Sequence, residues 1–171
     1  MKALWKVLGV ILACLLLLLV VARIVGFEPN GRRPGLWLKG DLVTTPVADW
    51  SFTDKIQNVK IQTTTWYLLP HSVTTGFIFH DGQLYITSMF GKGVPFPDGK
   101  SWVKNVMRDP HVRLKFGDNL YDCTLSPVSD PGERAAVLGP RAERNPQLLA
   151  SDSTNGPVLH LFHVQSMGEG I

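Results

Sequence analysis

The longest apolar run of the chain lies close to its first residue. Residues 7–22 carry no charged side chain and are almost wholly aliphatic, and residues 24–27 extend the run toward the roughly 20 residues that cross a bilayer. Lys6 and Arg23 flank the run, where their charged ends can reach the two membrane interfaces. The pattern predicts a single transmembrane helix within residues 1–27.

A cleaved signal peptide is the alternative interpretation of this segment, because Val20 and Ala22 place small residues where cleavage would occur after a basic start. Basic residues on the two sides of the segment slightly favour a cytoplasmic domain. They are Lys2 and Lys6 before it and Arg23, Arg32, Arg33 and Lys39 after it. Residues 28–35 are rich in proline and glycine and predict a linker, followed by a domain of residues 36–171.

Polar and apolar residues alternate along several stretches of this domain. Residues 58–67 have the period of a half-buried strand, which Pro70 is expected to end. The side chains on its predicted inner face are Val59, Ile61, Thr63, Thr65 and Tyr67. Residues 35–43 form a second extended run.

Two hairpins follow from local turn signals. The runs 73–80 and 83–88 flank Asp81 and Gly82, a pair that supplies the positive φ angles of a tight type I′ turn. A second hairpin is expected to turn at residues 117–119, between two runs that alternate in the same way.

Helices are predicted where capping residues precede an apolar face. In residues 101–108, Ser101 is placed to cap the helix. Its apolar face would consist of Trp102, Val103, Val106 and Met107. Asp130 is expected to cap a second helix that ends near Gly139, with Glu133 completing a capping box.

The last part of the chain predicts a short helix over residues 142–150 and a final strand over residues 158–164. About seven short strands with helices between them indicate a small, mainly antiparallel barrel of the α+β class.

The distribution of charged residues excludes one class of function. The net charge of +3 resides in Lys2, Lys6 and Arg23, so the domain is neutral and lacks the broadly basic surface of a nucleic-acid-binding protein. We therefore expect no nucleic-acid partner. The two cysteines and five histidines show no metal-ligand spacing, so no metal site is predicted.

One stretch of the neutral domain is nevertheless basic. Residues 84–115 contain six basic and two acidic side chains, and the predicted helix begins beside Lys100. The N-terminus of a helix presents free N–H groups and partial positive charge, so this stretch predicts a phosphate site to which Lys92 would add a second cation. An ordinary solvated basic face is the alternative.

The order of elements in this stretch resembles the split-barrel flavin-binding superfamily, which includes the pyridoxamine-phosphate oxidases. The loop is most similar to that of its deazaflavin-dependent nitroreductase and quinone reductase branch. The matching positions are Ser88, Gly91, Lys92, Gly93, Pro97, Trp102, Asn105, Val106, Asp109, Pro110 and Val112. Met89 and Phe90 separate the serine from the Gly-Lys-Gly run, which displaces Lys92 from the usual order.

The resemblance implies an antiparallel six-stranded split β-barrel, commonly a homodimer, that holds FMN or a deazaflavin coenzyme. The cofactor contacts that it implies are Ser88, Lys92, Lys100, Trp102 and Asn105. Tyr67 and His71 are candidate substrate contacts, with ordinary strand-end roles as the alternative. No catalytic acid or base is assigned, because the cofactor carries the hydride chemistry.

Two functions are compatible with these observations. The first is a membrane-anchored flavin- or deazaflavin-dependent oxidoreductase that transfers hydride to a hydrophobic or quinone-like acceptor. The second is a split barrel without cofactor that serves as a binding or accessory subunit of a membrane assembly. Relatives of this fold also suggest haem binding through a barrel histidine, for which the sequence contains no motif.

Overall fold

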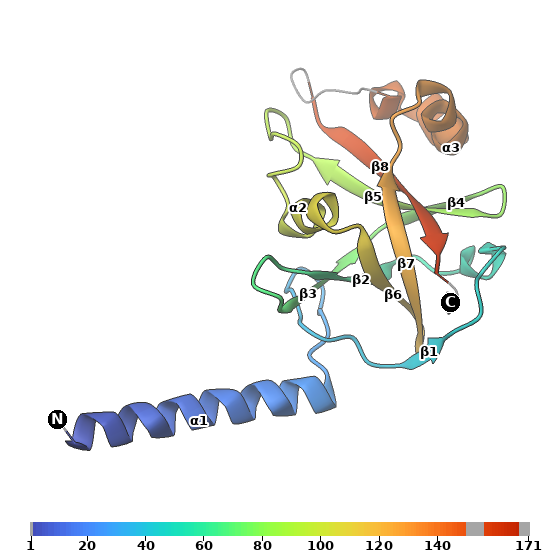
Figure 1. Cartoon of the computed structure of the whole chain (residues 1–171). Helices are drawn as coiled ribbons and strands as arrows, with labels where there is room; N and C mark the ends of the chain where they lie inside the picture. Colours follow the sequence, from blue (N-terminus) through green and yellow to red (C-terminus); the bar gives the residue numbers. More distant parts are fainter. Residues whose placement is uncertain (1, 150–155, 168–171) are drawn as a thin grey trace.

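A long helix extends away from a β-rich domain (Figure 1). The computed structural model describes residues 2–149 and 156–167. The helix, α1, spans Lys2–Val25, and its residues Ala3–Val25 are long and apolar enough to cross a membrane, with a mean hydropathy of 3.0. None of this apolar window is buried against the domain. A signal sequence would have the same length and composition, so the helix itself does not decide between the two interpretations.

The domain consists of eight strands and short helices within the described residues. The strands are β1 (Asp41–Val43), β2 (Val59–Thr64), β3 (Pro70–Thr75), β4 (Phe77–His80), β5 (Gln83–Phe90), β6 (His111–Phe116), β7 (Asn119–Pro127) and β8 (Val158–Ser166). The helices are α2 (Ser101–Arg108) and α3 (Pro131–Arg144), with 3-10 turns at Ser51–Thr53 and Pro146–Leu149.

The strands form one mainly antiparallel sheet in the order β3-β2-β6-β7-β8-β5-β4. Only Gly76 separates β3 from β4, and the ladder to β5 continues across it, because Thr87 N–H donates to the Gly76 carbonyl at 2.9 Å. A Cβ atom at residue 76 would lie 3.0 Å from the Thr87 hydroxyl, so the bend suits glycine. The sheet curls into a half-barrel, which is consistent with the expected split barrel, and its eight described strands exceed the six that the resemblance implies. The short β1 was not expected to be parallel, but it pairs parallel to β7.

Both predicted hairpins are confirmed. His80 pairs with Gln83 across Asp81 (φ 48°) and Gly82 (φ 76°), so both turn residues adopt the left-handed conformation that a type I′ turn requires. In the second hairpin Asn119 already pairs with Phe116, which leaves a turn of two residues in place of the expected three.

The other extended runs differ from expectation at their ends. The run 35–43 forms strand only at Asp41–Val43. The strand predicted over residues 58–67 stops at Thr64, so Tyr67 lies in the following turn and is exposed. Pro70 opens β3 as its first residue, a position where the missing N–H costs little.

The core lies inside the curled sheet and is closed on one side by α2. Trp102, Val103 and Val106 are buried as predicted, but Met107 is 45 % exposed. At 100° per residue Met107 falls beyond one edge of the buried face, whereas Asn105 falls within the other edge and is buried. The buried face of α2 is therefore turned by about 50°, half the rotation per residue, from the expected one.

The end of the chain matches the prediction in part. Asp130 caps α3, and its carboxylate accepts from the Glu133 N–H at 2.6 Å. The Glu133 carboxylate does not complete the capping box, because it accepts a hydrogen bond from the Tyr85 hydroxyl at 3.1 Å. The helix kinks at Gly139 and continues to Arg144. Of the short helix expected over 142–150, the structure has a 3-10 turn at Pro146–Leu149, and residue 150 lies outside the described residues.

Candidate functional site

A groove of about 390 Å³ lies between β3, the first turn of α2 and the segment that follows α1. Three cations line it, contributed by Arg32, Arg33 and Lys100. Thr74, Thr75 and Ser101 also line it, although the Thr75 hydroxyl already donates to the Thr87 carbonyl at 2.8 Å. The lining contains no carboxylate, so the groove combines positive charge with hydrogen-bond donors.

A tight turn holds the two arginines in place. The N–H of Asn30 donates to the Arg33 carbonyl at 3.1 Å, and the N–H of Arg33 donates back at 3.0 Å. Gly35 then exchanges two backbone hydrogen bonds with Ser72 of β3, at 2.8 and 3.0 Å. Residues 28–35, predicted to be a linker, are therefore attached to the domain and deliver Arg32 and Arg33 to the groove.

Lys100 is the N-cap residue of α2, and its ammonium group lies 5.9 Å from the centroid of the Phe90 ring. Burial lowers the pKa of Lys100 from its ordinary value of 10.5. Among the described residues, neither Lys100 nor Arg32 nor Arg33 takes part in an ion pair. An anion in the groove would therefore meet uncompensated positive charge.

The prediction that Ser101 caps α2 is wrong. Ser101 is the first residue of the helix, and its Oγ lies 3.0 Å from Nε2 of His71 on β3. The N-cap residue Lys100 makes no side-chain cap hydrogen bond. The first-turn N–H groups of α2 thus have no side-chain cap beside the groove, which suits an anion.

Trp102 lines the groove and Asn105 does not, and both side chains are engaged in the core. The Asn105 amide donates to the Thr63 hydroxyl at 3.0 Å, and this hydroxyl donates to the His71 carbonyl at 3.2 Å. Trp102 lines the groove wall, yet it is 4 % exposed and packs with its ring centroid 5.6 Å from that of Phe162. Both side chains support the start of α2 from inside the barrel.

The remaining residues nominated from the sequence do not line this groove. Ser88 lies on β5, is 1 % exposed, and its hydroxyl has no hydrogen-bond partner in the described structure. Lys92 is exposed in the loop between β5 and α2. Tyr67 is exposed at the β2–β3 turn. Lys100 and Trp102 thus line the groove, and His71 contacts Ser101 of its wall. Asn105 is engaged in the core, whereas Ser88, Lys92 and Tyr67 lie elsewhere.

Arg32 and Arg33 are the residues of the groove that sequence reasoning missed as candidate contacts. Their signal was present as an Arg-Arg pair next to glycine and proline, but it was read as part of a linker. The contact that brings the pair to β3 joins residues far apart in the sequence, so local pattern does not reveal it.

Comparison with known proteins gives structural neighbours only. No protein-family model matches the sequence, and no curated protein matches it. A pyridoxamine 5′-phosphate oxidase-like protein from Listeria innocua is 19 % identical, with a TM-score of 0.48 over 68 % of this chain and 88 % of its own. The heme storage protein HutZ from Vibrio cholerae is 13 % identical, with a TM-score of 0.46 over 68 % of this chain and 85 % of its own.

An F420-H2-dependent reductase, FDR-A, is 21 % identical, with a TM-score of 0.45 over 64 % of this chain and 95 % of its own. The similar structures thus include pyridoxamine 5′-phosphate oxidase-like proteins and F420-dependent reductases.

Proposed function

We propose that this chain is a membrane-anchored oxidoreductase whose groove holds the phosphate of FMN or of a deazaflavin coenzyme. The observation that carries the proposal is the convergence of Arg32, Arg33 and Lys100 on one groove beside the start of α2. Arginine presents paired N–H donors that match phosphate oxygens, and lysine adds a point charge. The residues present therefore fit a phosphate-bearing cofactor.

The roles of the protein side chains follow from this placement. Arg32, Arg33 and the first-turn N–H groups of α2 bind the phosphate, while Thr74 supplies a hydroxyl group along β3. The pair His71 and Ser101 fixes the start of α2 against β3 and so holds the groove open at a defined width. A bound flavin or deazaflavin supplies the hydride chemistry itself.

The apolar helix supplies the second part of the proposal. With residues 1–27 as a single-pass anchor, 28–35 as the connecting segment and 36–171 as the domain, the site is held close to a bilayer. A hydrophobic, quinone-like acceptor dissolves in the bilayer and is concentrated there. We place the domain on the cytoplasmic side, where reduced nicotinamide and deazaflavin pools are found. A reporter fused after Ile171 that is active only outside the cytoplasm would contradict this placement.

Cofactor titration tests the proposed function. The full chain, purified in detergent, is titrated with oxidised FMN and with oxidised deazaflavin, and binding is followed by cofactor fluorescence. We expect saturable binding of one of the two. The test variant replaces Arg32, Arg33 and Lys100 together by glutamine, which removes the positive charge of the groove and should abolish cofactor binding. Binding that is unchanged in this variant would place the cofactor elsewhere.

The alternative function is a split barrel without cofactor that acts as an accessory subunit. It is favoured by the position of Lys92 and Ser88, which the family resemblance nominates as cofactor contacts but which do not line the groove. Absence of saturable binding of both cofactors would support it. Native mass spectrometry from detergent then distinguishes a homodimer, which the resemblance implies, from a complex with another membrane protein.

A further inference from the structure

The tip of the β2–β3 hairpin is the most exposed apolar feature of the domain. Trp66 is 78 % exposed, Tyr67 53 % and Leu68 81 %, and the three are consecutive. The two aromatic rings meet edge to face with centroids 5.2 Å apart. We infer that this tip, residues 66–68, docks into the interfacial layer of the bilayer that α1 spans. The inference rests on the membrane anchoring in the proposed function.

The end of α1 is fixed to the domain. Phe27 N–H donates to the Trp37 carbonyl at 3.1 Å, and Leu36 N–H donates to the Phe27 carbonyl at 2.6 Å. The Arg23 guanidinium lies 5.9 Å from the centroid of the Trp37 ring. These contacts begin within the last turn of α1 and leave no flexible tether that would let the domain move away from the membrane.

The fixed segment also determines how far the tip lies from the anchor. Gly35 bonds to Ser72 on β3 and packs against the backbone of Phe27. Neighbouring backbones in such pairs are about 4.8 Å apart, so Ser72 lies within about 10 Å of Phe27. Leu68 is four residues before Ser72, at most roughly 13 Å further along the strand. The two distances add to at most about 23 Å. This exceeds the thickness of the headgroup region, about 5–8 Å on each side of a hydrocarbon core of about 30 Å, so the tip is long enough to reach it.

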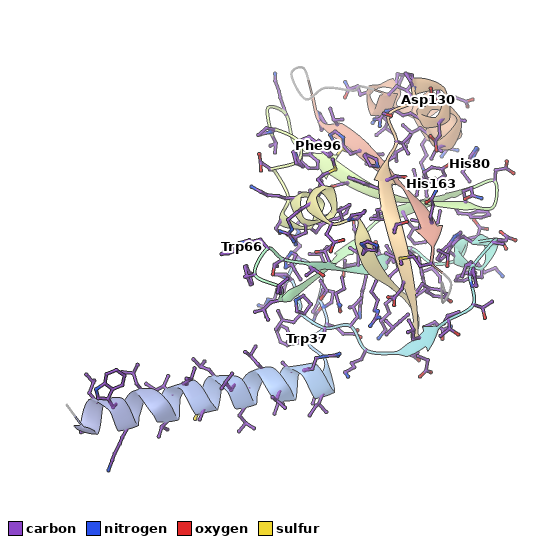
Figure 2. All side chains as sticks on the ribbon, in the orientation of Figure 1. Trp37, Trp66, His80, Phe96, Asp130 and His163 are labelled. Carbon is purple, nitrogen blue, oxygen red and sulfur yellow. The ribbon has the colours of Figure 1, made fainter. Side chains whose placement is uncertain are left out.

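The direction of the tip agrees with this estimate. Trp37 lies beside the end of α1, and Trp66 projects from the domain on the side toward which α1 extends (Figure 2). His80, at the β4–β5 turn, lies on the opposite side of the domain (Figure 2). The tip therefore faces the membrane, whereas the β4–β5 turn faces away from it.

The local chemistry of the tip matches a bilayer interface better than water. Tryptophan and tyrosine are enriched at the headgroup level, where the ring is buried and its polar end stays hydrated. The Arg108 guanidinium donates to the Thr64 carbonyl directly beside the tip, which places a cation next to anionic headgroups. Leu68 has a φ of 64°, a conformation that is rare for leucine.

The turn is closed by hydrogen bonds that hold the tip outward. Leu68 N–H donates to the Thr65 carbonyl at 3.0 Å, and Thr65 N–H donates to the Leu69 carbonyl at 2.9 Å. The Thr65 hydroxyl donates to the same Leu69 carbonyl at 2.7 Å. Because the turn is closed from within, the three apolar side chains are not needed to stabilise it, and their exposure calls for an external partner.

Spin-label accessibility tests the inference in the full chain, reconstituted in nanodiscs of phosphatidylcholine and phosphatidylglycerol. Three proteins are compared: the wild type labelled at Cys14, which is exposed on α1, and two variants that combine Cys14→Ala with Leu68→Cys or with Gln83→Cys. Cys123 is buried and remains unlabelled. Gln83 is exposed in the β4–β5 hairpin on the far side and is the matched control.

We expect the labels at positions 14 and 68 to be accessible to oxygen and protected from a water-soluble nickel complex, and the label at position 83 to show the reverse. A label at position 68 that the nickel complex reaches as readily as position 83, with position 14 protected, would overturn the inference while the anchor stands. Protection of position 68 from both reagents would also overturn it, because it would indicate a second copy of the chain as the partner. If position 14 is itself in water, the anchor in the proposed function fails.

Discussion

The Nε2 atom of His71 on β3 lies 3.0 Å from the hydroxyl of Ser101 in the first turn of α2. The contact joins the two elements that form the wall of the cationic groove. Burial lowers the pKa of His71 below its ordinary value of 6.5. The imidazole is therefore neutral at pH 7 and gains a proton only when the solution is acidified.

The first prediction concerns stability at acid pH. Below pH 6.5 the unfolded chain binds a proton at position 71 before the folded chain does, so acidification destabilises the fold. His160 acts in the same direction, because burial, followed by the positive charge of Arg134, lowers its pKa. The slope contributed by each histidine cannot exceed about 1.4 kcal/mol per pH unit. Urea unfolding of the detergent-solubilised chain at a series of pH values measures this slope.

Single replacements show which histidine causes the pH dependence of the free energy of unfolding. His71→Gln and His160→Gln should each remove part of the pH dependence between pH 7 and pH 5. His111→Gln is the matched control, since His111 is exposed and pairs with Asp109 on the surface. A pH dependence that is the same in all three variants would show that neither buried histidine is its origin.

The second prediction concerns which of two lysines, Lys100 or Lys92, contacts the cofactor phosphate. Replacing Lys100 by glutamine removes one charge-assisted hydrogen bond to a phosphate, worth about 1.5–3 kcal/mol, and should weaken FMN binding by about 10- to 150-fold. Lys92→Gln is the matched control and should change the dissociation constant by less than about twofold, because this side chain is exposed outside the groove. Fluorescence titration of both variants makes the comparison.

Riboflavin, which lacks the phosphate, sharpens the same experiment. Lys100→Gln should weaken FMN binding far more than riboflavin binding, because only FMN presents the group that Lys100 contacts. An equal loss for both ligands would mean that Lys100 acts through the shape of the groove. A larger loss in Lys92→Gln than in Lys100→Gln would mean that the cofactor phosphate binds at Lys92, as the family resemblance implies, and not in the groove.

Local signals were sufficient for the hairpins and for the cap of α3. Asp81 and Gly82 specify their turn by backbone preference alone, and Asp130 caps its helix through an N–H only three residues away. Such contacts depend on neighbours in sequence, so a sequence pattern contains them. The same holds for α2, whose apolar spacing predicted its bounds.

The composition of the groove could not be obtained in this way. Ser101 had the right residue type for a cap, but the helix begins one residue earlier than expected, so Lys100 takes the N-cap position and the Ser101 hydroxyl contacts His71 from another element. Arg33 and Lys100 meet only because Gly35 pairs with Ser72, a contact between distant segments that no periodicity encodes. The family resemblance, in turn, nominated Lys92 by its place in a motif that Met89 and Phe90 interrupt, and Lys92 does not line the groove.

The third prediction tests whether Asn105 is a structural residue. Its amide donates to the Thr63 hydroxyl inside the barrel, so Thr63→Val leaves a buried donor without its acceptor. This should lower the free energy of unfolding by about 1–3 kcal/mol. Thr64→Val, one residue along the same strand and facing the other side, should change it by less than about 0.5 kcal/mol. Urea unfolding followed by the fluorescence of the buried Trp50 and Trp102 measures both.

Cofactor titration of the same variants separates stability from binding. Because the Asn105 amide is already occupied by Thr63, Thr63→Val should leave the cofactor dissociation constant within about twofold at temperatures where the variant is folded. A loss of cofactor binding without a loss of stability would show instead that Asn105 contacts the cofactor, as the family resemblance implies.

The fourth prediction concerns Glu28, which joins the segment after α1 to the barrel. Its carboxylate accepts from the ammonium groups of Lys115 and Lys60, each at 2.5 Å, and from the Lys39 N–H at 3.1 Å. Burial alone would raise the pKa of Glu28, but these hydrogen bonds outweigh burial and lower it from 4.5 to about 2. The stabilisation is thus fully present above pH 4.5 and is lost as the pH falls through about 2.

Glu28→Gln removes this charge and leaves Lys115, whose side chain is 12 % exposed, without its counter-ion. We expect the free energy of unfolding at pH 7 to fall by about 2–3 kcal/mol and the pH dependence between 4.5 and 2 to flatten. Asp98→Asn is the matched control, because it breaks an ion pair with Lys104 whose side chains are 59 % and 66 % exposed, and should cost less than about 0.5 kcal/mol. Equal losses in the two variants would mean that Glu28 does not fix the anchor segment to the barrel. The backbone hydrogen bonds of Phe27 with Leu36 and Trp37, and of Gly35 with Ser72, would then hold this segment to the barrel without help from Glu28.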